Sequence, residues 1–337
     1  MPTPTNKGSY PEYLRLKELL SLQSGWKENE EDISADELHF IIVHQSFELW
    51  FKLVISELTQ ARDTLDGSYV QETEIPKAVH HMERAIETFR LMAQQWKVME
   101  TLTPQGFLSF RDELGTASGF ESKQMRMMEA IMGDFWVDSE KIENKLNEKS
   151  IQEVVTKWLS RTPIQGSLPD DSDDDKIVEE FVNEYLDIHL KLGEKAARTL
   201  SDNDSENIGN KFEEVNKQAS EFLKPNGKCD RSRTGLLFIE SYRELPLLSW
   251  PRKLIDTMVE LEEAMLLWRS SHARMVERMI GRRIGTGGSS GVDYLDRTAR
   301  YRVFTDLWGV RTILIKKEAL PELKNSEFYS FVGETND

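Results

Sequence analysis

The apolar residues of this chain recur mainly at helical spacing. One long stripe lies between residues 34 and 65, where steps of three and four residues place its members on one face of an α-helix. They are Phe40, Val43, Phe47, Phe51, Val54 and Leu58. Because Ile42, Leu49 and Leu53 add apolar side chains on the opposite side, we predict a central core helix. His44 belongs to the first stripe, so we expect its side chain to be well buried.

A second long stripe lies nearer the C-terminus, between Leu254 and Ile280. It contains Leu254, Met258, Leu261, Met265, Trp268, Met275 and Met279. At 1.5 Å per residue this predicts about 40 Å of continuous helix, and His272 lies in the same stripe. The helix is expected to end at Gly281. After the glycine-rich segment IGTGGSSGVDY, a further helix is predicted over residues 294–308.

The segments between these stripes also favour helices over strands. Helical spacing predicts a helix over residues 75–98, a short helix within the Pro- and Gly-containing stretch 102–120, and another helix that begins near Glu121. The acidic stretch 164–176 has the composition of an exposed loop. It lacks the ligand offsets and the glycine of an EF-hand calcium loop, so we do not expect it to bind a metal ion.

Together these patterns predict an all-α protein with a single helical-bundle domain over residues 1–337. The 39% hydrophobic content is sufficient for a substantial core. An N-terminal arm over residues 1–33 precedes the first long helix, and the acidic loop at about 164–176 is expected to be an insertion within the domain.

The charge and the cysteine content exclude several classes of protein. The 43 Lys and Arg against 59 Asp and Glu give a net charge of -16, which repels nucleic-acid backbones and anionic lipid surfaces. Cys229 stands alone, so the chain cannot form an internal disulfide, a multi-cysteine metal site or a c-type heme attachment. We find no signal peptide and no apolar run approaching about 20 residues. We therefore expect a cytoplasmic protein that binds neither nucleic acid nor membrane.

Two of the six histidines, His44 and His272, lie on strongly apolar helical stripes. Taken alone, each fits a core histidine held by a hydrogen bond. No HExxH and no Glu-x-x-His motif occurs, which disfavours a zinc peptidase and a four-helix di-iron site. Heme binding needs only one proximal imidazole and an apolar pocket. A thiolate heme ligand is disfavoured because Cys229 lies in the polar segment KPNGKCDRSR.

Two further features could bind an anion. The glycines of GTGGSSG, residues 285–291, could expose backbone N–H groups, but the segment lacks the Gly-Lys-Ser/Thr ending of a nucleotide-binding loop. It fits either a flexible connector or a clamp for a small anionic substrate. Arg111 stands among Phe107, Leu108 and Phe110. Its guanidinium either reaches the surface or turns inward to a carboxylate, and the spacing alone favours the surface.

Three long segments resemble tryptophan 2,3-dioxygenases. They are HFIIVHQSFELWFK from His39, LTPQGFLSFRDELGTASGF from Leu102, and HARMVERMIGRRIGTGGSSGVDYL from His272. The resemblance extends from SYPEYLRL near the N-terminus to ILIKKEALP near the C-terminus, and it weakens between residues 164 and 229. Motifs of this length in the family's order are a strong signal of membership.

The resemblance implies a helical homotetramer that binds heme b and uses O2 to open the C2–C3 bond of the indole of L-tryptophan, giving N-formylkynurenine. It implies that His272 is the proximal iron ligand and that His44 is the distal histidine facing the indole N–H. It also implies the remaining site residues: Phe40 at the indole, Arg111 with Phe107 and Leu114 at the carboxylate, Thr286 at the ammonium and carboxylate, Ser118 and Gly119 beside the heme, and Tyr10 and Tyr13 at a neighbouring subunit's site.

The chain departs from the family pattern at a few positions. Family members commonly carry a histidine where this chain has Glu277, a tyrosine in place of Phe47, and an aromatic-His pair in place of Val292 and Asp293. These departures affect the surroundings of the substrate loop more than the heme. They put the identity of the substrate in doubt, which leaves open monooxygenation of a substituted tryptophan to an oxindole. A non-catalytic heme-binding protein is a separate alternative, of a different class.

Overall fold

The computed structural model describes residues 8–115, 117–133, 148–200, 205–285 and 291–330. Within these ranges the chain forms helices and no strand, apart from an isolated β-bridge between Ile164 and Ser167. The all-α prediction is therefore confirmed. The chain forms two compact units, which are described separately: the first comprises Met1–Leu53, Glu87–Met125 and Ala264–Tyr301, and the second comprises Val54–Ile86, Arg126–Glu263 and Arg302–Asp337. The expectation of a single domain stays a prediction.

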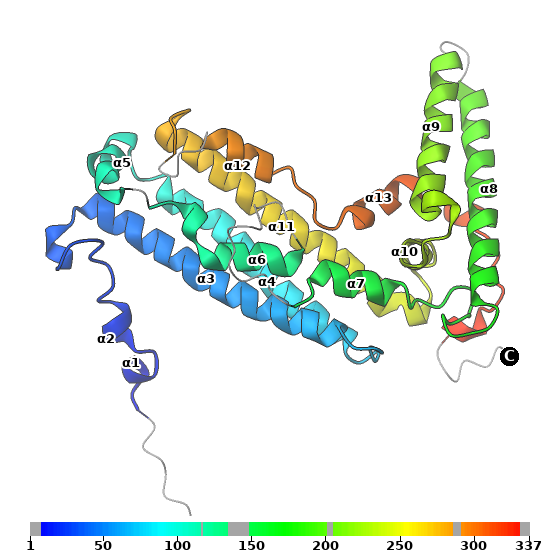
Figure 1. The fold of residues 1–337 in the computed structure, drawn as a ribbon, viewed down its shortest axis with the longest axis horizontal. Helices are drawn as coiled ribbons and strands as arrows, with labels where there is room; N and C mark the ends of the chain where they lie inside the picture. The colour runs from blue at the N-terminus through cyan, green and yellow to red at the C-terminus, as the bar shows by residue number, and fades with distance from the viewer. Residues whose placement is uncertain (1–7, 116, 134–147, 201–204, 286–290, 331–337) are drawn as a thin grey trace, which may run out of the picture. The chain divides into compact units, whose positions relative to one another are not determined.

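The first unit is built from parts of the long helices and from several short ones (Figure 1). It contains α1 (Tyr10–Tyr13), α2 (Leu16–Leu19), the 3-10 helix Glu30–Asp32, the beginning of α3 (Ala35–Leu65), the end of α4 (Ile75–Met99), α5 (Pro104–Arg111), the 3-10 helices Asp112–Leu114 and Gly119–Glu121, the start of α6 (Lys123–Met132), the end of α11 (Ser249–Ile280) and α12 (Val292–Thr298).

Local sequence signals set the ends of these helices. Ser34 precedes α3, and its hydroxyl accepts a hydrogen bond from the backbone N–H of Glu37 at 3.1 Å, as expected of an N-cap. Thr103 caps α5 in the same way, with its hydroxyl 3.0 Å from the backbone N of Gly106. α11 ends before Gly281, whose φ of +58° is a left-handed conformation that glycine adopts without strain.

An aromatic and aliphatic core holds the first unit together. Its buried members come from α3, α4 and α11: Val43, Phe47, Phe51, Phe89, Met92, Trp96, Trp268 and Met275. A polar bridge links two of these helices, because the Gln95 amide donates to the backbone O of Val43 and accepts from the indole N–H of Trp50, both at 3.1 Å. The parts of the two apolar stripes that belong to the first unit therefore meet in one core.

The second unit consists of α6 beyond Met125 and of five further α-helices in its described residues, together with segments of α3, α4 and α11. The five helices are α7 (Ile151–Leu159), α8 (Asp174–Leu200), α9 (Ser205–Leu223), α10 (Arg231–Ser241) and α13 (Thr305–Ile313); short 3-10 helices lie at Pro225–Gly227, Pro246–Leu248, Lys317–Ala319 and Glu327–Tyr329. α8 and α9 pack as a helical hairpin, green in Figure 1. Asp230 caps α10 by accepting from the backbone N–H groups of Ser232 and Arg233, each at 3.0 Å.

The long helices agree with the sequence patterns, whereas the predicted helix over residues 294–308 is wrong. The chain forms two helices there, α12 and α13, separated at residues 299–304. The reason lies on α11, where the fully buried carboxylate of Glu262 accepts hydrogen bonds from the backbone N–H groups of Val303 and Phe304. Because those two N–H groups bond to a side chain, they do not continue the helical ladder.

Two predictions about burial also need correction. The face of α3 opposite the core stripe is exposed, with Ile42 at 46% and Leu49 at 52%, so α3 is not buried on both sides. His44 is partly buried rather than well buried. The aromatic contacts of α3 all lie on the His44 side, and nothing within the described residues covers the other side enough to bury Ile42 or Leu49.

The acidic stretch 164–176 is exposed at residues 168–173 and again at residues 175 and 176. Gln165 and Asp174, which lie on either side of residues 168–173, are buried because they make specific bonds. The Gln165 side chain donates to the backbone O of Glu322 at 3.0 Å and accepts from the backbone N of Lys324 at 2.8 Å. Asp174, 3% exposed, pairs with Arg231 at 3.1 Å. The segment is thus an anchored turn rather than a wholly solvated loop.

Among the described residues, α3 is the one helix whose length and mean hydropathy would allow it to cross a membrane. Core helices of soluble proteins meet the same criterion, so this is weak evidence.

Candidate functional site

The first unit brings together the two histidines that the sequence singled out. His44 lies on α3 and His272 lies on α11, and each is partly buried. The Nδ1 of His44 is 2.8 Å from the backbone O of Phe40, one helical turn earlier. Since a carbonyl oxygen only accepts, Nδ1 carries the proton, and the Nε2 of the neutral ring is left as an acceptor. Burial lowers the pKa of His44, and the bond to Phe40 opposes this only in part.

His272 has a more strongly perturbed imidazole. Burial, with a smaller contribution from the neighbouring His44, lowers the pKa of His272 to about 3. The ring is therefore neutral at physiological pH, which is the form that binds a metal ion. Within the described part of the chain, neither ring nitrogen of His272 has a hydrogen-bond partner. Its lone pair is therefore free for a ligand bond.

Aromatic side chains form the walls around both histidines. The Trp96 ring stacks on the His272 ring, with centroids 4.4 Å apart and ring planes 1° from parallel. The Phe40 ring lies 3.9 Å from that of His44. Trp268 packs 6.1 Å from His272. The indole N–H groups of Trp96 and Trp268 are buried and have no hydrogen-bond partner within the described residues.

α5 closes one side of this aromatic cluster. The Phe107 ring is 5.8 Å from that of Phe40, and the Phe110 ring is 5.6 Å from it. Arg111 ends the same helix, and its Nη2 donates to the backbone O of Ile284 at 2.6 Å. Arg111 is partly buried and bonded to the segment after α11, so the surface orientation that its spacing favoured is only partly correct.

The other predicted site residues differ in how the structure places them. Leu114 is partly buried in the 3-10 helix that directly follows Arg111, and Ser118 is partly buried. Gly119 is exposed, and a Cβ built on it would have no atom within 4 Å, so there is open space beside it. Thr286 lies outside the described residues.

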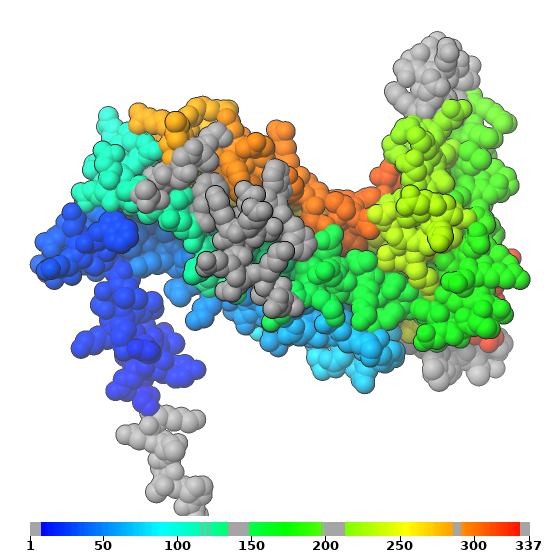
Figure 2. Space-filling view, in the orientation of Figure 1, coloured from blue at the N-terminus to red at the C-terminus, as the bar shows by residue number. Residues whose placement is uncertain are grey.

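The tyrosines of the N-terminal arm do not join the cluster in the isolated chain. Tyr10 is 72% exposed and Tyr13 is 84% exposed. The dark-blue segment that carries them is uncovered on the face shown in Figure 2. No ring contact links them to His44, Phe40 or the other site residues in the described part of the chain.

Two features of the site were not predicted from the sequence. One is the Trp96 stack, because Trp96 lies on α4 and His272 lies far along the chain on α11, so no local pattern links them. The second is an ion-pair cluster that ties α12 to the end of α11. Arg274 pairs with Asp296, and Arg282 pairs with Asp293.

Glu277 completes this ion-pair cluster. It pairs with Arg274 and lies 3.6 Å from Arg282. Glu277 and Asp293 thus share one arginine, because both carboxylates pair with Arg282.

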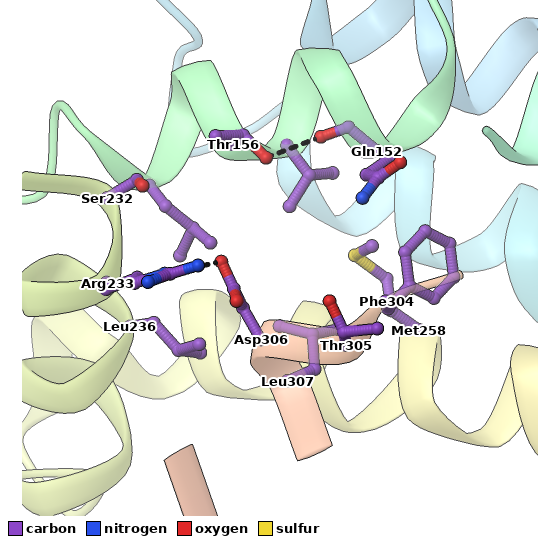
Figure 3. A pocket seen from close by; sticks show the side chains of 12 residues that line it. Gln152, Thr156, Ser232, Arg233, Leu236, Met258, Phe304, Thr305, Asp306 and Leu307 are labelled. Carbon is purple, nitrogen blue, oxygen red and sulfur yellow. Dashed lines mark hydrogen bonds and ion pairs between the residues drawn. The ribbon is translucent and has the colours of Figure 1, made fainter. Parts of the chain in front are cut away.

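The second unit contains a separate small cavity between α7, α10, α11 and the start of α13 (Figure 3). Its volume is about 30 Å³, which is room for a water molecule and too little for an amino acid. An ion pair between Arg233 and Asp306, at 3.0 Å, lies in its wall. Among the described residues, no group of three His, Cys, Asp or Glu side chains could hold a metal ion.

Comparisons with known proteins agree with the geometry. The family model described as tryptophan 2,3-dioxygenase matches residues 3–314. The chain is 39% identical to tryptophan 2,3-dioxygenase 2 of Ralstonia nicotianae, over 97% of this chain and 98% of the relative. It is 38% identical to tryptophan 2,3-dioxygenase of Sorangium cellulosum, over 97% of this chain and 88% of the relative. A tryptophan 2,3-dioxygenase-like protein of Xanthomonas campestris is 40% identical, over 69% of this chain and 99% of the relative.

Proposed function

The chain belongs to the tryptophan 2,3-dioxygenase family, and from this we propose that it is a heme-dependent enzyme that cleaves the C2–C3 bond of L-tryptophan with O2 to give N-formylkynurenine. The observation that carries the proposal is the pair of neutral imidazoles, His44 and His272, enclosed by aromatic side chains of α3, α4 and α5.

The residues of this site fit a heme group. His272 offers a neutral imidazole with no competing hydrogen bond in the described residues, and the aromatic walls provide the apolar surroundings that a porphyrin needs. His272 would hold the iron, and Ser118 and Gly119 would border the group, with open space beside Gly119. When bound, heme supplies the iron that binds and activates dioxygen.

His44 is suited to orient the indole. Its Nδ1–H donates to the backbone O of Phe40, so its Nε2 can accept a hydrogen bond from the indole N–H of the substrate. The lowered pKa of His44 keeps this nitrogen unprotonated at neutral pH. Phe40 and Phe107 give the indole an apolar surface. We infer that His44 contributes by positioning the indole ring through this hydrogen bond, and not by removing a proton from the substrate.

Arg111 is suited to bind the substrate carboxylate. Its guanidinium has five donors, and in this structure Nη2 is bonded to the backbone O of Ile284. A carboxylate would offer charge-assisted bonds in place of this neutral one. Leu114 would line the same side, and Thr286 would bind the ammonium and carboxylate groups.

The exposed apolar residues support a homo-oligomer, which we propose to be a tetramer. Ile42, Leu49, Tyr10 and Tyr13 are all 46% exposed or more, and a second copy of the chain would remove them from water. In that assembly Tyr10 and Tyr13 would reach a neighbouring subunit's site. The net charge of -16 fits a cytoplasmic protein that binds neither nucleic acid nor anionic membrane.

The two alternatives raised by the sequence have no supporting observation. The relatives from Ralstonia nicotianae and Sorangium cellulosum both carry the name of a tryptophan 2,3-dioxygenase, which does not favour monooxygenation to an oxindole. A non-catalytic heme protein would have no use for a partly buried Arg111 beside the aromatic cluster.

A heme titration tests the ligand assignment. The wild-type chain, His272→Ala and His189→Ala would each be titrated with hemin, and the Soret band would be recorded. His189 is a suitable control because it is a buried histidine that lies in the second unit, with its Nδ1 2.7 Å from the side-chain oxygen of Asn216. We expect stable heme in the wild type and in His189→Ala, and loss of stable heme in His272→Ala. Full heme occupancy of His272→Ala contradicts the assignment.

A further inference from the structure

Trp96 has the closest aromatic contact with His272. It lies on α4, is 3% exposed, and places its ring parallel to the imidazole at a centroid distance of 4.4 Å. Phe47 packs against it at 4.2 Å, which fixes the indole in place. Trp96 also lies 6.4 Å from His44, edge to face. One buried side chain therefore contacts both histidines.

Among the described residues, the His272 ring has no hydrogen-bond partner of the kind that usually sets the orientation of a metal-binding histidine. Such a histidine generally donates its second N–H to a carboxylate, a carbonyl or a water. Within the described residues no such protein group bonds to His272. Rotation about the bond between Cβ and the ring is then limited only by packing. The parallel face of Trp96 is the surface that limits it.

We propose that Trp96 is a positioning residue that fixes the ring plane of His272 by stacking. This inference rests on the proposed function, in which His272 holds heme iron. It is the flat face of the Trp96 ring that restricts rotation of the His272 ring. The buried indole N–H has no partner within the described residues, so it does not contribute a hydrogen bond to His272.

Two substitutions separate the ring face from the other properties of Trp96. Trp96→Phe keeps a flat aromatic face and removes the N–H, whereas Trp96→Leu removes both. Phe89→Leu is the matched control, because Phe89 lies on the same helix, is fully buried and packs 6.3 Å from Trp268. In the described residues Phe89 makes no ring contact with either histidine. Phe89→Leu therefore creates a cavity in the same core, smaller than that of Trp96→Leu, without removing a ring from either histidine.

The experiment uses the full-length, heme-loaded protein. The resonance Raman band of the ferrous iron–histidine stretch reports the orientation and strength of the His272 bond, and transfer of heme to apomyoglobin reports its retention. We expect Trp96→Leu to shift or broaden the band and to speed heme loss about tenfold, as for the loss of an orienting partner. Trp96→Phe should keep the wild-type band. Phe89→Leu should lower the melting temperature and leave the band unchanged.

Three results overturn the inference. The first is a wild-type band and wild-type heme retention in Trp96→Leu. The second is the same change in Trp96→Phe as in Trp96→Leu, which assigns the effect to the N–H. The third is an equal change of the band in Phe89→Leu, which assigns it to core packing. If Trp96→Leu does not fold, Trp96→Met, a flexible side chain without a ring, makes the same comparison. A wild-type protein that binds no heme contradicts the proposed function itself.

Discussion

Arg111→Leu tests how the site distinguishes an amino acid from other indoles. In the structure the Arg111 guanidinium donates one hydrogen bond, from Nη2 to the backbone O of Ile284 at 2.6 Å. A substrate carboxylate would replace this neutral bond with two charge-assisted ones. The leucine variant removes the guanidinium and leaves the carboxylate without that partner.

The magnitude follows from the bonds exchanged. Two charge-assisted hydrogen bonds contribute about 1.5 to 3 kcal/mol each, and the released neutral bond contributes about 1 kcal/mol. The net effect is about 2 to 5 kcal/mol. Arg111 is only partly buried, and solvent screening favours the lower end. We therefore expect L-tryptophan to bind about 30-fold more weakly to Arg111→Leu.

The assay compares two ligands that differ only in the carboxylate. The shift of the Soret band would be titrated with L-tryptophan and with tryptamine, for the wild type, Arg111→Leu and Arg111→Lys. The leucine variant should lose affinity for L-tryptophan and keep its affinity for tryptamine. The affinity of Arg111→Lys for L-tryptophan should lie between those of the wild type and Arg111→Leu, because an ammonium group is charged but cannot form the planar pair of bonds to a carboxylate. An equal loss for both ligands, with heme content unchanged, would refute a carboxylate-binding role.

Three further predictions follow from the buried and paired charges. The pKa of His272 is about 3 in the folded chain and about 6.5 in an unfolded one, so the unfolded state binds more protons between these pH values. The free energy of unfolding of the apoprotein should therefore fall by up to about 5 kcal/mol as the pH drops from 6.5 to 3. Urea unfolding of His272→Leu should show a weaker pH dependence, and an unchanged pH dependence in this variant contradicts the prediction. Glu262→Leu leaves the N–H groups of Val303, Phe304 and Trp308 without their acceptor, and it should lower the free energy of unfolding by about 3 to 6 kcal/mol; a loss below about 1 kcal/mol in urea unfolding contradicts this anchor. Asp293→Asn breaks an exposed ion pair, so it should change the free energy of unfolding by less than about 1 kcal/mol, with a smaller difference in 0.5 M NaCl than in about 0.05 M; a larger, salt-independent loss would show another role.

Much of the helical architecture could be predicted because its cause is local. The stripes of α3 and α11 repeat at helical spacing over many residues, and Ser34 and Gly281 mark ends in the sequence. The break between α12 and α13 could not be predicted in this way. It depends on Glu262, whose carboxylate reaches backbone groups about 40 residues later, and no local pattern reveals such a contact.

The candidate site shows a similar division. The apolar stripes indicated that His44 and His272 were unusual, and the family resemblance suggested roles for them. The spacing could not show that the Nδ1 of His44 is bonded to Phe40, nor that Trp96 stacks on His272. Both are contacts set by tertiary packing. The roles of the remaining site residues stay predictions, and Thr286 lies outside the described residues.

The exposed face of α3 shows why the apolar pattern of this helix predicted more burial than the structure has. Ile42 and Leu49 are as apolar as the core residues beside them, but their side chains are exposed in the isolated chain. A sequence pattern cannot distinguish a face that packs within one subunit from a face that a second copy would cover. The ion pair of Arg282 with Asp293 was equally hidden, because Arg282 follows the end of α11 whereas Asp293 lies on α12.

The most direct test of the proposed reaction is the oxygen balance of the product. The heme-loaded, reduced protein would be mixed with L-tryptophan under ¹⁸O-labelled dioxygen, and the product would be analysed by mass spectrometry. We expect N-formylkynurenine that has gained two oxygen atoms, both labelled. A product that has gained one labelled atom, or no product from a protein with full heme occupancy, would rule out the proposed dioxygenase reaction.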